Sequence, residues 1–350
     1  MERPLFLGIV GLALAGLACG GTKATSGSGG AGGSASAAGG SDAAGGSGAG
    51  IDYETYALEI GPIDVPSGVE RTQCVTKRLG NPEPILVHRI DNHLSALSHH
   101  MIIYTTNATE EVLEPQDCSP FLDTLDPTKG APLMVSQKLE DSLQLPEGVA
   151  IKLEQNQMIR IELHYINTSA SADQITATST MSVLPDELFQ HEAGFLFVGN
   201  PDISIPPMSQ HTLGPSHFLL PGDYSDANFF AITGHTHQWG TDVQVETADA
   251  SGATVDSVYA PADFSWEEPE TVQHDPPFSV PQGGGFNFTC SWNNQSTDTV
   301  SFGESANQEM CFFWAYYYPN QGAKVCFHTD QVAGGLDLCC PGNFLCDQLF

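Results

Sequence analysis

The chain has 350 residues, of which 11 are Lys or Arg and 42 are Asp or Glu, so its formal net charge is −31. This length leaves room for two domains of ordinary size after a low-complexity start. Such an acidic surface repels phosphate backbones and anionic lipid headgroups, which makes nucleic acid and membrane surfaces poor partners. The charge could favour a cationic substrate, but the preferred interpretation is that it keeps an exported protein soluble.

The first residues predict an export signal. Arg3 precedes an apolar run from Leu5 to Leu17, followed by Cys19. At about 13 residues the run is too short to span a bilayer as a helix. Gly16-Leu17-Ala18-Cys19 is similar to a bacterial lipobox with Gly where Leu is usual, and simple cleavage after Ala13-Leu14-Ala15 is the alternative. We expect a signal peptide over residues 1–19, a candidate lipid anchor at Cys19, and export to the periplasm or to the outer membrane or cell surface.

Residues 20–50 are almost entirely Gly, Ser and Ala. They cannot bury apolar surface, so we expect a disordered linker that holds a folded module away from the anchor. Without Cys19 an even set of cysteines remains, which in an exported chain indicates disulfides, although spacing alone does not fix their pairing. They are Cys74, Cys118, Cys290, Cys311, Cys326, Cys339, Cys340 and Cys346.

From Ile51 onward, short apolar runs alternate with Pro, Gly, Asn and Asp, and no long helical periodicity or internal repeat is apparent. The segment Leu113–Leu125 is irregular or helical in this interpretation. The pattern predicts an all-β protein built of β-sandwiches. Examples of the runs are Pro84-Ile85-Leu86-Val87, Met101-Ile102-Ile103-Tyr104, Ala193-Gly194-Phe195-Leu196-Phe197-Val198 and Phe229-Phe230-Ala231-Ile232.

The clearest strand is Met158–Ile166, in which apolar and polar residues alternate. One face would carry Ile159, Ile161, Leu163 and Tyr165, and the other Arg160, Glu162 and His164. The apolar pattern is interrupted near Leu184–His191, which predicts an N-terminal domain over residues 51–187. A C-terminal domain with a cysteine-rich tail would follow over residues 188–350.

Histidines form the candidate functional motifs. His235-Thr236-His237 follows an apolar strand, and residues i and i+2 of a strand point to the same side, so both imidazoles can reach one ion. The alternative is a polar strand face near a turn, because Gly234 and Gly240 are adjacent.

His99 and His100 are neighbours, and neighbours on a regular strand face opposite ways. Joint ligation therefore needs a bulge, a strand end, or different ring nitrogens. Otherwise one is buried and the other exposed. His164 taken alone belongs to the solvated face of its strand.

Read together with their flanks, four motifs occur in one order, and this order resembles that of the copper type II, ascorbate-dependent monooxygenases. That is the family of peptidylglycine α-hydroxylating monooxygenase and dopamine β-monooxygenase. The resemblance covers roughly Tyr53 to Cys326. The motifs are Ser98-His99-His100-Met101-Ile102-Ile103-Tyr104, Ile161-Glu162-Leu163-His164-Tyr165, His235-Thr236-His237, and Glu309-Met310-Cys311 with Tyr317-Tyr318-Pro319, with further echoes in Ile205-Pro206-Pro207 and Leu220-Pro221-Gly222.

The resemblance implies two tandem jelly-roll-like β-sandwich domains, each holding one copper ion, which face each other across a solvent-filled cleft. The first copper would store and deliver an electron. The second would bind O2 and hydroxylate a C–H bond of a small organic substrate, with ascorbate or another one-electron reductant as donor. The implied ligands are His99, His100 and His164 for the first ion, and His235, His237 and Met310 for the second.

Ligand chemistry independently favours copper. Imidazole suits both oxidation states and the thioether of Met310 suits Cu(I), whereas a zinc site more often carries a carboxylate or thiolate. The alternative for Met310 is core filler beside Phe312, Phe313 and Trp314.

The resemblance also implies two disulfides, Cys74–Cys118 and Cys290–Cys311, with the remaining four cysteines, after Cys311, pairing among themselves.

Two departures from the family's pattern bear on the substrate. Thr233 stands where the peptidylglycine enzyme has an arginine that grips the peptide carboxylate, so a C-terminal glycine substrate is disfavoured and an amine is one candidate. Glu162 replaces a glutamine, and it either orients His164, attracts a cation, or is a solvated glutamate.

Two other classes of function remain open. One is an exported copper-binding protein without turnover, which needs the same ligands but no organised substrate cleft. The other is a jelly-roll adhesion or carbohydrate-binding module that keeps its histidines as relics. Metal content and O2 uptake separate the three.

Overall fold

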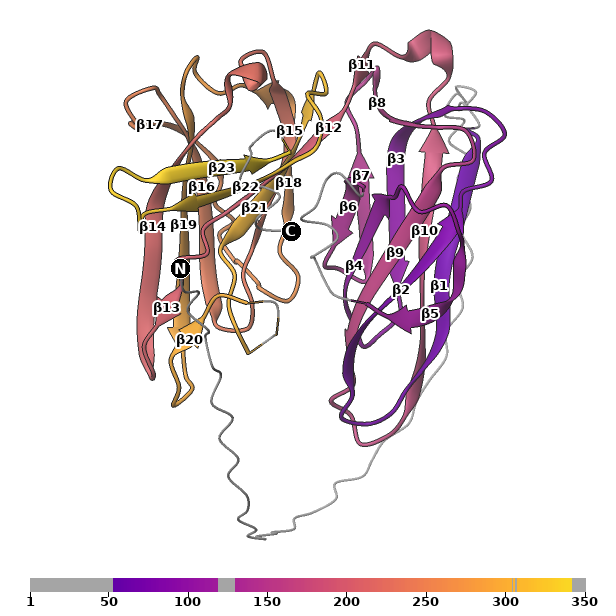
Figure 1. Ribbon diagram of the computed structural model, residues 1–350, viewed down its shortest axis with the longest axis horizontal. Coiled ribbons are helices and arrows are strands. Elements are labelled where there is room, and N and C mark those ends of the chain that lie inside the picture. Colours follow the sequence, from indigo (N-terminus) through magenta and orange to yellow (C-terminus); the bar gives the residue numbers. More distant parts are fainter. Residues whose placement is uncertain (1–52, 119–129, 304, 306, 342–350) are drawn as a thin grey trace, which may run out of the picture. The chain divides into compact units, whose positions relative to one another are not determined.

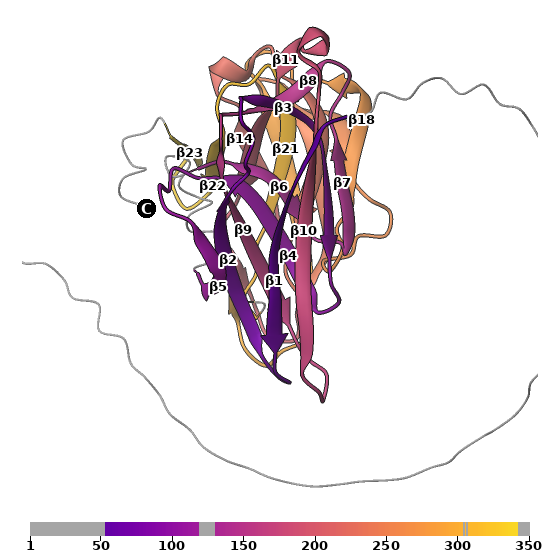
Figure 2. The same cartoon turned by 90° about the vertical axis from the view of Figure 1, so that its right-hand side faces the viewer.

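The computed structural model describes residues 53–118, 130–303, 305 and 307–341. The predicted signal, Cys19, the linker and Cys346 lie outside the described residues. The chain from Ile51 to Phe350 forms one compact unit. It is nearly all β-strand (Figures 1 and 2), which confirms the predicted fold class. Within the described part the helical segments are two short 3₁₀ turns, η1 (Asp186–Leu188) and η2 (Gly222–Tyr224), and none of its helices could cross a membrane.

The N-terminal half, up to β11, contains two sheets. The first is six-stranded, and in it β7 (Glu140–Gln144) pairs with β3 beside a path of five strands. The path runs β1 (Thr55–Val65), β10 (Asp173–Val183), β3 (Ile85–Leu94), β8 (Val149–Leu153) and β11 (His191–Glu192). The second sheet runs β5 (Val112–Asp117), β2 (Glu70–Arg78), β9 (Met158–Ile166), β4 (Ser98–Thr105) and β6 (Pro132–Ser136).

The C-terminal half, from β12 onward, contains a six-stranded sheet, a four-stranded sheet and a two-stranded pair, β13 (Ser204–Ile205) with β20 (Val300–Ser301). The six-stranded sheet runs β18 (Thr271–Phe278), β15 (Asn228–His235), β21 (Phe312–Tyr318), β12 (Gly194–Gly199), β22 (Lys324–Thr329) and β23 (Leu336–Cys340). The four-stranded sheet runs β14 (Ser209–Leu219), β19 (Gly285–Asn294), β16 (Gly240–Ala248) and β17 (Thr254–Tyr259).

Strand β21 is apolar at almost every position because both of its faces are buried. Phe312, Trp314 and Tyr316 belong to the core cluster that fills the N-terminal half. The alternate residues Phe313, Ala315 and Tyr317 belong to the core cluster of the C-terminal half. A strand buried on both faces reads as a continuous apolar run. The two halves therefore share one apolar core across the sheet that contains β21.

Strand β9 confirms the predicted alternation, because Ile159, Ile161, Leu163 and Tyr165 are at most 2% exposed. The helical alternative for Leu113–Leu125 is wrong over its described part, where Val112–Asp117 is strand β5. The division into domains at residue 187 stays a prediction.

The cysteines pair as expected where they are described. Cys74 bonds to Cys118, Cys290 to Cys311 and Cys326 to Cys339. Cys340 is also disulfide-bonded. The bond at Cys311 ties the residue after Met310 to the middle of β19.

Two turns repeat one hydrogen-bond pattern. At the end of β9, the Asn167 side-chain carbonyl accepts hydrogen bonds from the amide and hydroxyl of Ser169. At the end of β19, Asn294 accepts the same pair of bonds from Ser296. No internal repeat is apparent in the sequence, yet one strand of each half ends in the same hydrogen-bond pattern.

His328 on β22 is 4% exposed and held between two carboxylates. Its Nδ1 lies 2.7 Å from Asp337 Oδ1 and its Nε2 lies 3.2 Å from Asp330 Oδ1. The hydrogen bond with Asp337, opposed by burial, raises the pKa of His328. The imidazolium therefore adds stability that is complete below about pH 6.5, the pKa of an unfolded histidine, and is lost as the pH rises through the raised folded pKa.

We predict that Asp337→Asn lowers the free energy of unfolding more at pH 5.5 than at pH 8.5, because only the protonated imidazole gains from the carboxylate. Chemical denaturation at both pH values measures the difference. Asp330→Asn is the control, because the Asp330 side chain is 63% exposed and its loss should matter less. Equal destabilisation by Asp337→Asn at both pH values would contradict the assignment.

Candidate metal centre

A bulge brings the neighbours His99 and His100 together. The pairing of β4 with β9 shifts register between Ser98 and His100, and His100 then lies opposite His164. Leu97, just before the strand, has a φ of 74°, a left-handed conformation that costs a leucine about 1–2 kcal/mol. The backbone is therefore strained where both imidazoles turn to one side, and the structure contains the bulge, one of the three alternatives that the sequence left open.

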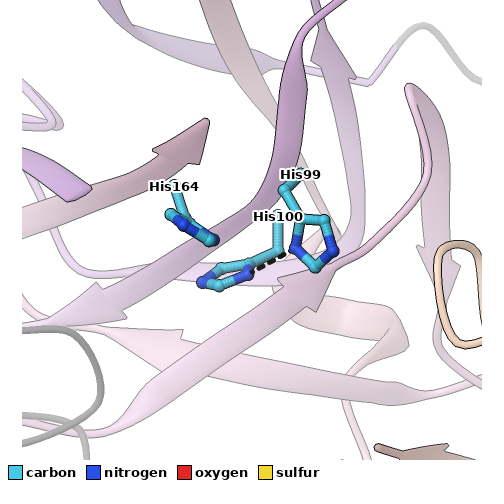
Figure 3. Close-up of side chains that lie close together, drawn as sticks. All are labelled: His99, His100 and His164. Atoms are coloured by element: carbon cyan, nitrogen blue, oxygen red, sulfur yellow. Dashed lines mark hydrogen bonds between the residues drawn. The ribbon is translucent and has the colours of Figure 1, made fainter. Parts of the chain in front are cut away.

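The three imidazoles form a compact group, called here the first histidine cluster (Figure 3). Each offers a ring nitrogen, and these nitrogens lie within 4.8 Å of one another. The ring centroids of His100 and His164 are 4.9 Å apart, and those of His99 and His164 are 5.3 Å apart. His99 Nδ1 lies 3.3 Å from His100 Nδ1.

The ring of His164 is oriented for metal binding. Its Nε2 lies 3.1 Å from Glu70 Oε1, and a carboxylate can only accept, so the proton is on Nε2. Nδ1 keeps its lone pair and is buried without a hydrogen-bond partner, as is Nε2 of His99. A carboxylate behind an imidazole is the usual arrangement around a bound metal. The cluster therefore fits a cation such as copper.

Glu70 is a residue that the sequence analysis missed. Only the pairing of β2 with β9 brings it near His164, and a sequence does not state which strands pair. Glu162 was the predicted neighbour of the ligand, but its solvated alternative is wrong because it is completely buried. Its Oε2 accepts a hydrogen bond of 3.1 Å from the hydroxyl of Tyr104.

Burial keeps these imidazoles neutral. It lowers the pKa of His99 and of His164 to about 4, with a further contribution from His164 to His99 and from His237 to His164. Burial also lowers the pKa of His100 well below its usual value. A metal binds the neutral imidazole, so the cluster is ready for a cation at neutral pH.

The second histidine cluster consists of His235 and His237, whose ring centroids are 5.1 Å apart. Strand β15 ends at His235, so His237 lies in the following turn and not on the strand, as the i, i+2 argument had assumed. The turn closes through a hydrogen bond from Gly240 N to His237 O of 2.9 Å. Only glycine fits at 240, because a Cβ there would lie 1.8 Å from the hydroxyl of Thr236.

Glu309 organises the backbone of this turn, and sequence reasoning had used it only as part of a motif. Its carboxylate accepts hydrogen bonds from His237 N at 2.8 Å, Trp239 N at 2.7 Å and Trp292 Nε1 at 2.9 Å. The amide of Met310 donates to it as well. Burial raises the pKa of Glu309 to about 7 despite these donors. One buried carboxylate thus ties the backbones of His237 and Met310 together.

The Nδ1 atom of His237 lies 3.0 Å from Gln308 O and 3.1 Å from Ser305 O. Carbonyl oxygens only accept, so Nδ1 carries the proton and Nε2 keeps the lone pair. Burial lowers the pKa of His237 to about 4 and that of His235 well below its usual value. Met310 is 3% exposed and belongs to the apolar core, so a packing role accompanies any role as a ligand.

A histidine of each cluster is contacted by a side chain from the other half. Gln137 Nε2, from the N-terminal half, lies 2.9 Å from His235 Nδ1. Trp266, from the C-terminal half, lies against His99 with ring centroids 5.5 Å apart. His237 contributes to the lowered pKa of both His164 and His100. Side-chain contacts between the two halves therefore lie beside both clusters.

Comparison with known proteins bears on the second cluster. Residues 192–333 match the family described as copper type II ascorbate-dependent monooxygenase, C-terminal domain. The match supports the copper type II, ascorbate-dependent monooxygenase family for this chain. The match contains His235, His237 and Met310, whereas the first histidine cluster lies outside it. Copper and ascorbate are the metal and reductant that the family's description implies.

A curated relative agrees. The mouse (Mus musculus) DBH-like monooxygenase protein 2 is 26% identical over 210 residues, which cover 55% of this chain and 33% of the relative. The chain thus matches about a third of the length of that monooxygenase.

Solved structures add only distant likenesses. The major capsid protein P2 of bacteriophage PM2 is similar over 77% of this chain and 100% of its own, at 10% identity and a TM-score of 0.31. The glycosylasparaginase PNGase F of Flavobacterium meningosepticum is similar over 81% of this chain and 99% of its own, at 9% identity and a TM-score of 0.35.

We predict that Glu70→Ala lowers the copper affinity of the first histidine cluster by roughly 10–100-fold, because His164 loses the carboxylate that orients its ring. Competition with a chromogenic chelator measures the affinity. Glu59→Ala, at an exposed position of β1, is the matched control. An unchanged affinity would show that Glu70 does not orient the ring.

We predict that Glu309→Gln lowers the free energy of unfolding by about 2–4 kcal/mol, because an amide turns its own N–H groups toward buried donors. The substitution should also weaken metal binding at the second cluster, since the backbones of His237 and Met310 are no longer tied together. Denaturant unfolding measures the first effect, with the exposed Glu147→Gln as control. A Glu309→Gln variant as stable as the parent protein would contradict the role of Glu309 in organising this turn.

Proposed function

We propose that this chain is a copper-dependent monooxygenase that hydroxylates a C–H bond of a small organic substrate with O2 and an external reductant. Ascorbate is the reductant that the family's description names. The observation that supports this most is the first histidine cluster, whose three ring nitrogens lie within 4.8 Å of one another. The family match does not cover these three histidines, which form the first of the two predicted copper sites.

In this proposal two copper ions are held per chain. His99, His100 and His164 hold one, and His235, His237 and Met310 hold the other. Copper bound at these groups would supply one-electron transfer and the activation of O2. Hydroxylation places one oxygen atom in the substrate and releases the other as water, with two electrons from the reductant.

The protein groups around the clusters prepare the ligands. Glu70 holds the proton on Nε2 of His164, and the carbonyl of Gln308 holds the proton on Nδ1 of His237. Each ring therefore presents a defined lone pair without rearrangement. The disulfide at Cys311 and the bonds to Glu309 keep Met310 beside the turn of His237.

The substrate class is constrained by Thr233. Its side chain is 1% exposed, and its hydroxyl lies 2.8 Å from that of Thr271. A buried neutral hydroxyl offers no ion pair to a peptide carboxylate, so a C-terminal glycine is a poor substrate. The net charge of −31 favours the approach of cations, and we therefore propose amines as the first substrates to test.

Export and anchoring belong to the same proposal. Three disulfides among the described residues are compatible with an oxidising compartment. A signal over residues 1–19 with a lipid at Cys19 would place the module outside the cytoplasm, at the end of the linker. The mass of the mature protein tests this directly.

Met310→Leu tests the catalytic assignment. Leucine fills a similar volume, so we expect stability to fall by less than about 1.5 kcal/mol, while hydroxylation is lost because the thioether is gone. O2 uptake and product formation by the copper-loaded protein, with ascorbate and candidate amines, measure activity. Met208→Leu, at a position 69% exposed, is the matched control.

Hydroxylation at the parent rate by Met310→Leu would remove Met310 from the chemistry. A parent protein that binds two coppers but consumes no O2 with any substrate would favour the alternative, an exported copper-binding protein without turnover. Fewer than two coppers per chain after reconstitution would contradict the two-site proposal itself.

A further inference from the structure

Gln137 lies just after strand β6 in the N-terminal half, yet its side chain reaches a ligand candidate of the C-terminal half. It is 5% exposed, and its amide nitrogen lies 2.9 Å from Nδ1 of His235. We infer that Gln137 is a positioning residue that fixes the proton of His235 on Nδ1 and so keeps the metal-binding lone pair on Nε2. The inference rests on the proposed copper site at His235 and His237.

The hydrogen-bond chemistry decides which end of the amide faces His235. A neutral imidazole has one N–H and one lone pair. If Nε2 of Gln137 donates to Nδ1, the ring proton must sit on Nε2 of His235, and that nitrogen cannot bind a metal. If the carbonyl Oε1 accepts from Nδ1 instead, Nε2 keeps its lone pair.

The contact with His235 satisfies only one of the two ends of the Gln137 amide. Oε1 of Gln137 is buried without a hydrogen-bond partner when Nε2 faces His235. The two ends of an amide have nearly the same shape, and their assignment follows from the hydrogen bonds. A half-turn of the amide gives Oε1 a donor, moves Nε2 to the position that Oε1 had occupied, and leaves the packing unchanged.

Two other candidate ligands support this orientation, because each of their rings faces a group that can only accept a hydrogen bond. Nδ1 of His237 faces the carbonyl of Gln308, and Nε2 of His164 faces the carboxylate of Glu70. Each is a pure acceptor that fixes the ring proton away from the metal side. Gln137 completes the pattern for His235.

Gln137 is held firmly enough to serve this purpose. The carboxylate of Asp141 accepts hydrogen bonds from the Ser136 side chain and from the backbone of Gln137. Ser136 in turn accepts a bond of 2.7 Å from Asn92 on β3. These bonds fix the turn that carries Gln137, so the amide is directed at His235 by the N-terminal half as a unit.

A consequence is that a histidine of each cluster contacts a side chain of the other half. Gln137 crosses from the N-terminal half to His235, and Trp266 crosses from the C-terminal half to His99. Separating the halves would release the ring of His235 from its acceptor. Copper binding at the second cluster therefore depends on contact with the first half.

The test measures Cu(I) affinity by chelator competition and the Cu(II) electron paramagnetic resonance spectrum, both in the full chain with His164→Ala, which weakens metal binding at the first cluster. In this background we expect Gln137→Leu to lower the affinity of the second cluster by roughly 10–100-fold and to alter its spectrum. Gln137→Glu keeps an acceptor and should retain the affinity. Gln210→Leu, at an exposed position of β14, is the matched control.

Two results would overturn the inference. One is a Gln137→Leu variant that binds copper as tightly as its parent. The other is a Gln137→Glu variant that binds as weakly as Gln137→Leu, which would mean that the amide donates to Nδ1. If Gln137→Leu does not fold, Gln137→Asn replaces it with the same expectation, because the shorter amide cannot span to Nδ1.

Failure of the proposed function is recognised separately. A His164→Ala parent that binds no copper at the second cluster would remove the copper site and the role of Gln137 together. A parent that binds copper and responds to Gln137 as expected, but hydroxylates no substrate in the wild-type background, would leave the positioning role intact and remove only the monooxygenase activity.

Discussion

Burial of both faces of the sheet that contains β21 is the constraint on which the rest of the structure depends. Alternate residues of β21 enter different cores, so Trp314 packs toward the N-terminal half and Phe313 toward the C-terminal half. Since apolar burial contributes roughly 25 cal/mol per Å², removing one half would expose a whole sheet face to water. The shared core is what allows Gln137 and Trp266 to reach across to histidines of the other half.

Around both clusters, the chain places pure acceptors behind the imidazole rings. A carboxylate faces His164 and backbone carbonyls face His237, and burial keeps both rings neutral at physiological pH. The cost of burying these polar groups is offset only if each free lone pair finds a partner. A bound cation is such a partner, which is why the arrangement is more informative than the presence of histidines alone.

Sequence reasoning succeeded where the pattern is local. The apolar face of β9 and the cysteine pairs that the family resemblance implies correspond to what the structure contains, and the bulge at His99 is one of the alternatives left open. It failed where a role depends on strands that pair far apart in the chain. Glu70 lies 94 residues from His164, and Gln137 lies 98 residues from His235. Neither carries a local signal.

By itself, the sequence determined the strand-rich class, the order of the histidine motifs and hence the resemblance to the family, because periodicity and short motifs lie in neighbouring residues. Only the tertiary structure decided which carboxylate orients His164, that Glu162 is buried against Tyr104, and that Glu309 joins the backbones of His237 and Met310. These relations come from register and from the packing of one half on the other. Both are set by the burial of whole sheet faces, a property that no single stretch of residues contains.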